Sequence, residues 1–233
     1  MPKARQDGEN SLHMKTIAIY TYMNEGGPMP AEPHNAAKWK AAGFDFICFV
    51  KKKEGLPDFS GSWYLDELPI SWSDARLNAV LPKLNPQSVL EEFYDYSLWL
   101  DPGVSITGDG IYQCCKDLQD RGAVYADLKS GSNIWSYAYR VWKDGLEPFP
   151  VVRKALGYLL GKGIGPWSGY HDTSVIFRKH TDEAVLAMDR WWWECLLDRA
   201  GGHCEQLMHI FALKDTPSLK WEQMKPDGIL IPR

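Results

Sequence analysis

The stretch Tyr96-Ser-Leu-Trp-Leu-Asp-Pro-Gly103 decides how the fold of this chain is interpreted. Its first five residues form an apolar run of aromatic and branched side chains, which predicts a buried strand. Asp101 follows directly, and Pro102-Gly103 turns the chain there. In open α/β sheets, ligands bind outside the carboxyl ends of the strands. An acid at this place is therefore positioned either to hold a divalent metal ion and a diphosphate, or simply to cap the turn.

Outward from this stretch, apolar runs that predict strands alternate with amphipathic runs that predict helices. The predicted strands are Lys15–Tyr22, Phe44–Val50, Ala123–Leu128, Thr173–Arg178 and an edge strand at Gly228–Ile231. The predicted helices are Asn35–Ala42, Asp74–Leu81, Gln87–Phe93, Ile111–Arg121, Asn133–Lys143, Val151–Leu160, Thr181 or Asp182 to Arg199, and Glu205–Lys214, with a loop at Gly61–Ser73. This alternation predicts an α/β fold with a mostly parallel central sheet flanked by helices.

The 233 residues, 45% of them hydrophobic and 24% charged, suit one soluble globular domain, expected over residues 15–233. Residues 1–14 show no periodicity and are expected to be a disordered segment or a tag. The net charge of −4 argues against a nucleic-acid or membrane partner held by the charge of the chain as a whole.

Neither a transmembrane segment nor a disulfide framework is expected. No apolar run approaches the roughly 18 residues that span a bilayer, although peripheral membrane association is left open. The five cysteines, with Cys114 and Cys115 adjacent, indicate reduced thiols and a cytoplasmic location. Eleven tryptophans favour a sugar or nucleotide ligand, because indoles stack on such rings as well as filling cores.

Several short motifs occur in an order that resembles a known family. An Asp-x-Arg, a lysine-bearing helix and a Trp-hydrophobic-Asp strand end follow one another, at Asp74, Arg76, Lys83, Trp99 and Asp101. An Arg-x-His strand end, a tryptophan-rich helix and an acid-Gln-Leu helix start come later, at Arg178, His180, Trp191–Trp193 and Glu205–Leu207. Together they resemble glycosyltransferases of the GT-A fold, and most closely the TOD/MUCI-type glycosyltransferase-like family.

The resemblance implies a GT-A-like single domain that moves a sugar from a nucleotide-diphosphate sugar to a glycan acceptor, in surface polysaccharide synthesis. It also implies Mn²⁺ or Mg²⁺ as the cofactor. One departure affects the metal: the family's second acid is replaced by Gly103, so Asp101 lacks a paired carboxylate.

The expected metal ligands are Asp101 and His180, with His209 weighed beside His180 as a ligand or a diphosphate donor. Glu205 is the candidate general base for the acceptor hydroxyl, and Asp172 is the rival base. Each of these side chains also has an ordinary structural interpretation, such as a helix-end acid for Glu205.

The nucleotide sugar is expected to contact residues from two parts of the chain. The residues expected to bind its diphosphate and sugar are Arg76, Lys83 and Trp99. Those expected to bind its nucleoside, in the loop after Tyr20, are Thr21, Tyr22 and Asn24. A surface ion pair with Asp74 is the structural alternative for Arg76.

Two other classes of function compete with the transferase. A non-catalytic nucleotide- or carbohydrate-binding protein on the same fold is favoured by the missing second acid. A nucleotidyltransferase would need a basic residue in the glycine-rich loop after the first strand, and Asn24-Glu-Gly-Gly27 has none.

Overall fold

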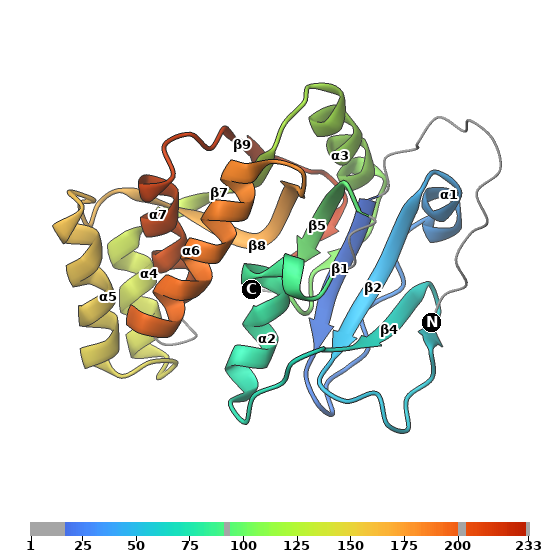
Figure 1. Cartoon of the computed structure of the whole chain (residues 1–233), viewed down its shortest axis with the longest axis horizontal. Helices are drawn as coiled ribbons and strands as arrows, with labels where there is room; N and C mark the ends of the chain where they lie inside the picture. The colour runs from blue at the N-terminus through green and yellow to red at the C-terminus, as the bar shows by residue number, and fades with distance from the viewer. Residues whose placement is uncertain (1–16, 91–93, 200–203, 232–233) are drawn as a thin grey trace.

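The computed structural model describes residues 17–90, 94–199 and 204–231 of the chain. Its main feature is an eight-stranded sheet in the order β3-β4-β2-β1-β5-β8-β7-β9 (Figure 1). The strands are β1 Ile17–Met23, β2 Phe44–Val50, β3 Phe59–Ser60, β4 Trp63–Glu67, β5 Tyr96–Leu100, β7 Tyr125–Asn133, β8 Gly169–Lys179 and β9 Trp221–Met224. A separate two-stranded sheet pairs β6 Ser105–Ile106 with β10 Ile229–Leu230.

Helices cover both faces of the main sheet. They are α1 Ala36–Ala41, α2 Ala75–Leu84, α3 Gly110–Asp120, α4 Ile134–Lys143, α5 Phe149–Gly161, α6 Glu183–Arg199 and α7 Glu205–Asp215, with a short 3₁₀ turn at Pro86–Ser88. Apolar residues of α2 and α4 to α7 share one core, and those of α1 and α3 share the other. Figure 1 shows α4 to α7 gathered at one end of the molecule.

Four neighbouring strands, β4, β2, β1 and β5, are mutually parallel. Counted in chain order, they lie in the sequence 3-2-1-4, so the direction of winding reverses between β1 and β5. Such a reversal opens a crevice at the carboxyl ends of the two strands, where ligands bind in open α/β sheets. β1 is buried along its whole length, as a central strand between two helical layers requires.

The other half of the sheet is mixed, because β8 runs antiparallel to both β5 and β7. The predicted fold class, an α/β domain with a mostly parallel central sheet flanked by helices, is confirmed. The proposed disordered segment at residues 1–14 lies outside the described residues. No helix in the described parts of the chain is both long and apolar enough to cross a membrane.

Two local predictions were wrong. The stretch Gly61–Ser73 was expected to be a loop, but it contains β4, which pairs with β2. The side chains of β4 alternate between buried Trp63 and Leu65 and more exposed neighbours, so this strand between turns is too short for a clear signal. The helix predicted at Gln87–Phe93 is only the turn Pro86–Ser88 in its described part.

A buried ion pair fixes the helices that carry the candidate site. Arg178 on β8 donates to Asp189 on α6 at 3.0 Å, and both side chains are fully buried. The same guanidinium donates to the backbone carbonyl of Lys83 at 2.6 Å. Because that carbonyl lies at the end of α2, Arg178 ties the end of this helix to the sheet. Pro82 does not end the helix, which continues to Leu84.

Candidate functional site

Asp101 lies at the reversal between β1 and β5, directly after the last residue of β5. Its Oδ1 accepts a hydrogen bond from the indole nitrogen of Trp99 at 2.6 Å. The ammonium of Lys83 lies 2.9 Å from the same oxygen and 3.2 Å from Oδ2. The Asp101 side chain remains 28% exposed, so its carboxylate faces the protein on one side and solvent on the other.

Lys83 is the centre of this group, although its side chain is only 4% exposed. It extends from the last turn of α2 and also lies 3.5 Å from Oε1 of Glu205. Burial by itself would lower the pKa of Lys83, but Asp101, Glu205 and Asp172 outweigh burial and raise it. The lysine therefore remains a cation that joins α2, β5 and α7.

Glu205 is the first residue of α7, and its side chain is 13% exposed. Its backbone carbonyl accepts a hydrogen bond from the indole nitrogen of Trp192 at 2.7 Å. Trp192 is fully buried in the core, whereas its neighbours Trp191 and Trp193 are half-buried beside it. The middle tryptophan of the run thus fixes where α7 begins and so where Glu205 lies.

Asp172 lies next to this group on β8. Its Oδ1 accepts a hydrogen bond from the backbone nitrogen of Ser174 at 3.0 Å, and the carbonyl of Ser174 accepts one from the nitrogen of Asp101 at 2.7 Å. Asp172 also lines a cavity of about 450 Å³ together with Met224 and Asp227. We call Asp101, Lys83, Asp172 and Glu205 the lysine group.

A cavity of about 510 Å³ lies elsewhere, over β2 and β4. It is lined by Ile47, Phe49, Tyr64, Tyr94 and other residues, and none of the predicted site residues contributes to it. Its position beside the edge of the sheet, away from the reversal between β1 and β5, gives it no connection with the lysine group. We therefore place the candidate site at the lysine group.

Of the three residues expected to bind the nucleoside, only Asn24 lies in an exposed loop. Thr21 and Tyr22 are buried within β1, because this strand pairs with β2 as far as Met23. The expectation that all three belong to one ligand loop was wrong. The ligand loop was expected after Tyr20, but β1 continues to Met23, three residues farther.

Trp99 does not present its ring to a ligand. The side chain is fully buried, and its ring lies edge-on to Tyr20 at a centroid distance of 5.2 Å. Its polar contribution is the hydrogen bond from the indole nitrogen to Asp101. The residue therefore positions the acid, in contrast to the expected contact with the nucleotide sugar.

Arg76 lies apart from the lysine group, in the first turn of α2. Its guanidinium pairs with Asp74 at 3.2 Å and with Glu147 at 3.4 Å. Lys83 is seven positions farther along the helix, about 10 Å along the axis. The structure therefore shows the ion pair with Asp74 that was the alternative for this arginine.

His180 cannot share a metal ion with Asp101. It follows β8, whose residue Lys179 pairs with Tyr96 at the opposite end of β5 from Asp101. The length of β5 puts roughly 16 Å between the two ends. The prediction was wrong because β8 runs antiparallel to β5, a pairing that the local sequence does not reveal. Burial, and then the charge of Arg178, lower the pKa of His180 to about 4.

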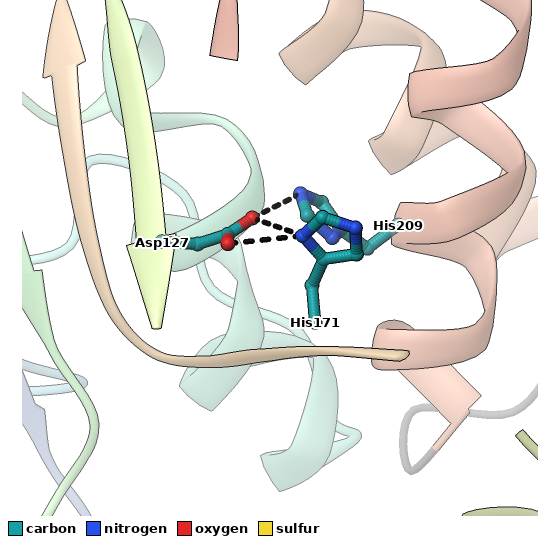
Figure 2. A group of neighbouring side chains, drawn as sticks. All are labelled: Asp127, His171 and His209. Atoms are coloured by element: carbon teal, nitrogen blue, oxygen red, sulfur yellow. Dashed lines mark hydrogen bonds and ion pairs between the residues drawn. The ribbon is translucent and has the colours of Figure 1, made fainter. Parts of the chain in front are cut away.

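A second polar group, not predicted as a set, lies beside the lysine group. Asp127 of β7, His171 of β8 and His209 of α7 converge from three elements (Figure 2). Nδ1 of His171 lies 2.8 Å from Oδ2 and 2.9 Å from Oδ1 of Asp127. Nε2 of His209 lies 3.9 Å from Oδ2 of Asp127 and 2.6 Å from the hydroxyl of Tyr125. We call Asp127, His171 and His209 the histidine group.

The two groups meet on α7. Glu205 and His209 are four residues apart and therefore lie on the same face of the helix. Burial, followed by the charges of His171, Arg178 and Lys83, holds the pKa of His209 well below its ordinary value, so this imidazole is neutral. Burial likewise raises the pKa of Asp127, although the hydrogen bond from His171 opposes it.

The histidine group has ligand atoms within 4.8 Å of one another, a spacing that could hold a metal ion. No sequence motif pointed to it, because its members come from three elements and none is near another in the chain. His209 alone was weighed as a ligand. Within the described ranges, Asp101 belongs to no such set of three ligands.

No protein-family model and no curated protein matches this chain. Among solved structures, mouse xyloside xylosyltransferase 1 in its apo form is similar at 7% identity and a TM-score of 0.47, over 90% of this chain and 84% of that one. The 4-diphosphocytidyl-2C-methyl-D-erythritol synthase of Anaerococcus prevotii is similar at 11% identity and a TM-score of 0.47, over 92% and 90%. The bifunctional glycosyltransferase WbbM is similar at 10% identity and a TM-score of 0.49, over 93% of this chain and 40% of that one. At these identities and TM-scores, the similarity to the solved structures assigns no role to any residue of this chain.

Proposed function

We propose that this protein is a glycosyltransferase that moves a sugar from a nucleotide-diphosphate sugar to a glycan acceptor in surface polysaccharide synthesis in the cytoplasm. The observation that supports it is the lysine group at the reversal between β1 and β5. A buried cation and three acids gathered at the ligand-binding edge of an α/β sheet suit transfer chemistry better than stability alone, because buried charges are costly to maintain.

Glu205 is the proposed general base. In the transfer, an acceptor oxygen forms a bond to the anomeric carbon as the bond from that carbon to the diphosphate breaks. The acceptor proton passes to the Glu205 carboxylate, and the electron pair leaves with the diphosphate. Lys83 lies 3.5 Å from Oε1 of Glu205 and supplies a fixed positive charge near the leaving group. Asp172 is the alternative base, since it lines the adjoining cavity.

Mn²⁺ or Mg²⁺, which the family resemblance implies, does not fit at Asp101. Both carboxylate oxygens lie within 3.2 Å of the Lys83 ammonium, Oδ1 is also bound to Trp99, and Gly103 offers no second acid. The histidine group has the spacing for a metal, but two of its three donors are imidazoles, which suit zinc or iron better than magnesium. The proposed transfer therefore uses no metal step.

The test is to assay nucleotide release from a panel of nucleotide sugars, with and without glycan acceptors. Glu205→Gln is expected to lower the rate by about 10²-fold or more, the usual contribution of a general base. Asp58→Asn is the matched control, because Asp58 is an exposed acid paired with Lys53. No release with any donor, or equal rates in the Glu205 and Asp58 variants, would contradict the proposal.

The second candidate function is a non-catalytic nucleotide- or carbohydrate-binding protein. The bonds from Lys83 and Trp99 to Asp101 favour it, because they use the carboxylate that a metal-dependent transferase would need. Binding of a nucleotide sugar without release, with acceptors present, would identify this function.

A further inference from the structure

The α4–α5 end of the molecule carries apolar side chains on its outside as well as its inside. On α4, the buried stripe is Ile134, Tyr137, Ala138 and Val141. A second stripe, Trp135, Tyr139 and Trp142, lies about a third of a turn around the helix from the first, and each of these residues is 46–50% exposed. A helix that is apolar on both sides is expected where its outer side also meets an apolar environment.

The outer stripe of α4 continues onto α5. Phe149 and Leu160 are 50% and 57% exposed, and Phe149 lies edge-on to Trp142 at a centroid distance of 5.5 Å. An apolar groove of about 270 Å³ between the helices is lined by Trp135, Phe149 and Leu160 among others. Trp167, which follows the groove residue Pro166, is 76% exposed.

We call this surface the aromatic face; it consists of Trp135, Tyr139, Trp142, Phe149, Leu160 and Trp167. Scattered exposed apolar residues are common, but six large ones at one end of the molecule, three of them lining one groove, are typical of an interaction surface. Figure 1 shows α4 and α5 at the end of the molecule farthest from α1 and β4, so a flat partner could approach this end directly.

The segment that carries the aromatic face has mainly positive charges, in contrast to the chain as a whole, although Lys162 is paired with Asp215. Between positions 134 and 166 there are five basic residues and two acidic ones, in a protein of net charge −4. Lys143 lies 5.9 Å from the ring of Tyr139, and Arg153 lines the groove. One of the two acids, Glu147, is buried and paired with Arg76.

We propose that the aromatic face binds the surface of an anionic lipid bilayer. Tryptophan and tyrosine rings favour the membrane–water interface, and basic residues beside them are attracted to anionic headgroups. A second copy of the chain fits less well, because a symmetric contact would bring Lys143 and Arg153 against the same residues of the partner. Membrane association would thus depend on local charge, which the net charge of the chain conceals.

The test is co-sedimentation of the full chain with vesicles of phosphatidylcholine alone and of phosphatidylcholine mixed with phosphatidylglycerol. Binding is expected only to the anionic vesicles and should weaken at high salt. The double variant Trp135→Ser/Trp142→Ser should lose about tenfold or more in partitioning, and so should Lys143→Glu/Arg153→Glu. Phe59→Ser is the matched control, because Phe59 is 57% exposed on the edge strand β3.

Circular dichroism and thermal melting establish that each variant is folded. Absence of binding to anionic vesicles, or equal binding by the tryptophan variant and the Phe59 variant, would overturn the proposal. So would a dimer in solution that the tryptophan substitutions convert to a monomer, since the partner would then be a second copy. The measurement needs no enzymatic activity, so its result is independent of the proposed sugar transfer.

Discussion

The ammonium of Lys83 lies 2.9 Å from Oδ1 of Asp101, the carboxylate that the sequence predicted as a ligand of a divalent cation. Lys83 lies at the end of α2, and its backbone carbonyl accepts a hydrogen bond from the buried Arg178. The position of this cation is therefore determined by the core of the protein, and its charge by the acids around it.

Replacing Lys83 with methionine should affect both stability and activity. The substitution removes the cation that pairs with both Asp101 and Glu205. Removing one partner of a buried ion pair costs about 3–5 kcal/mol in the free energy of unfolding, and the exposure of Asp101 places the expected loss at the lower end. Chemical denaturation measures the stability, and nucleotide release measures the activity.

The double variant Lys83→Met/Asp101→Asn is the control for this prediction. Neutralising the acid as well should recover part of the lost stability without recovering activity. A single variant of wild-type stability would show that the pairing of Lys83 with the two acids contributes little to the fold.

Trp99→Phe should lower the rate of nucleotide release by a larger factor than its loss in the free energy of unfolding explains. The substitution keeps an aromatic ring in the core but removes the donor to Asp101, which frees the carboxylate to move. A hydrogen bond to a charged group contributes about 1.5–3 kcal/mol. Trp63→Phe is the matched control, because buried Trp63 donates only to the backbone carbonyl of Ala31. Equal activity of the two variants would remove Trp99 from the site.

Much of the fold could be predicted because its strands and helices follow strong local patterns. The apolar runs of β1, β2 and β5 and the cap of Asp182, whose side chain accepts from the nitrogens of Ala184 and Val185, are properties of short segments. The placement of Asp101 at a strand end came from the same kind of signal.

The remaining site features depend on how distant segments pair. Because β8 runs antiparallel to β5, His180 lies far from Asp101 and Asp172 lies near it. A parallel pairing would reverse this arrangement. The histidine group requires β7, β8 and α7 to converge, so no spacing in the sequence could identify it. Lys83 and Glu205 were each predicted separately, but their ion pair depends on α2 and α7 both packing against α6.

Removal of divalent metal should leave the transfer rate within about tenfold of its original value, because the proposed cation at Asp101 is the Lys83 ammonium. The measurement is nucleotide release after dialysis against a chelator, with and without added Mn²⁺. A large loss that Mn²⁺ restores would contradict this expectation. The variants then locate the ion: restoration that fails in Asp101→Asn assigns it to Asp101, and restoration that fails in His171→Ala assigns it to the histidine group.

The free energy of unfolding should fall as the pH falls from 6.5 toward 4. The pKa of His180 is lowered from 6.5 to about 4 in the folded protein, so the unfolded chain binds more protons in this range and acid favours unfolding. The contribution from His180 is at most about 3 kcal/mol, and buried His209 acts in the same direction.

Denaturation at a series of pH values should give a shallower slope for His180→Gln than for the wild-type protein. His34→Gln is the control, because His34 is a histidine with a 47% exposed side chain. If His180→Gln kept the full slope, the acid sensitivity would have to come from His209 and the carboxylates, and not from the end of β8.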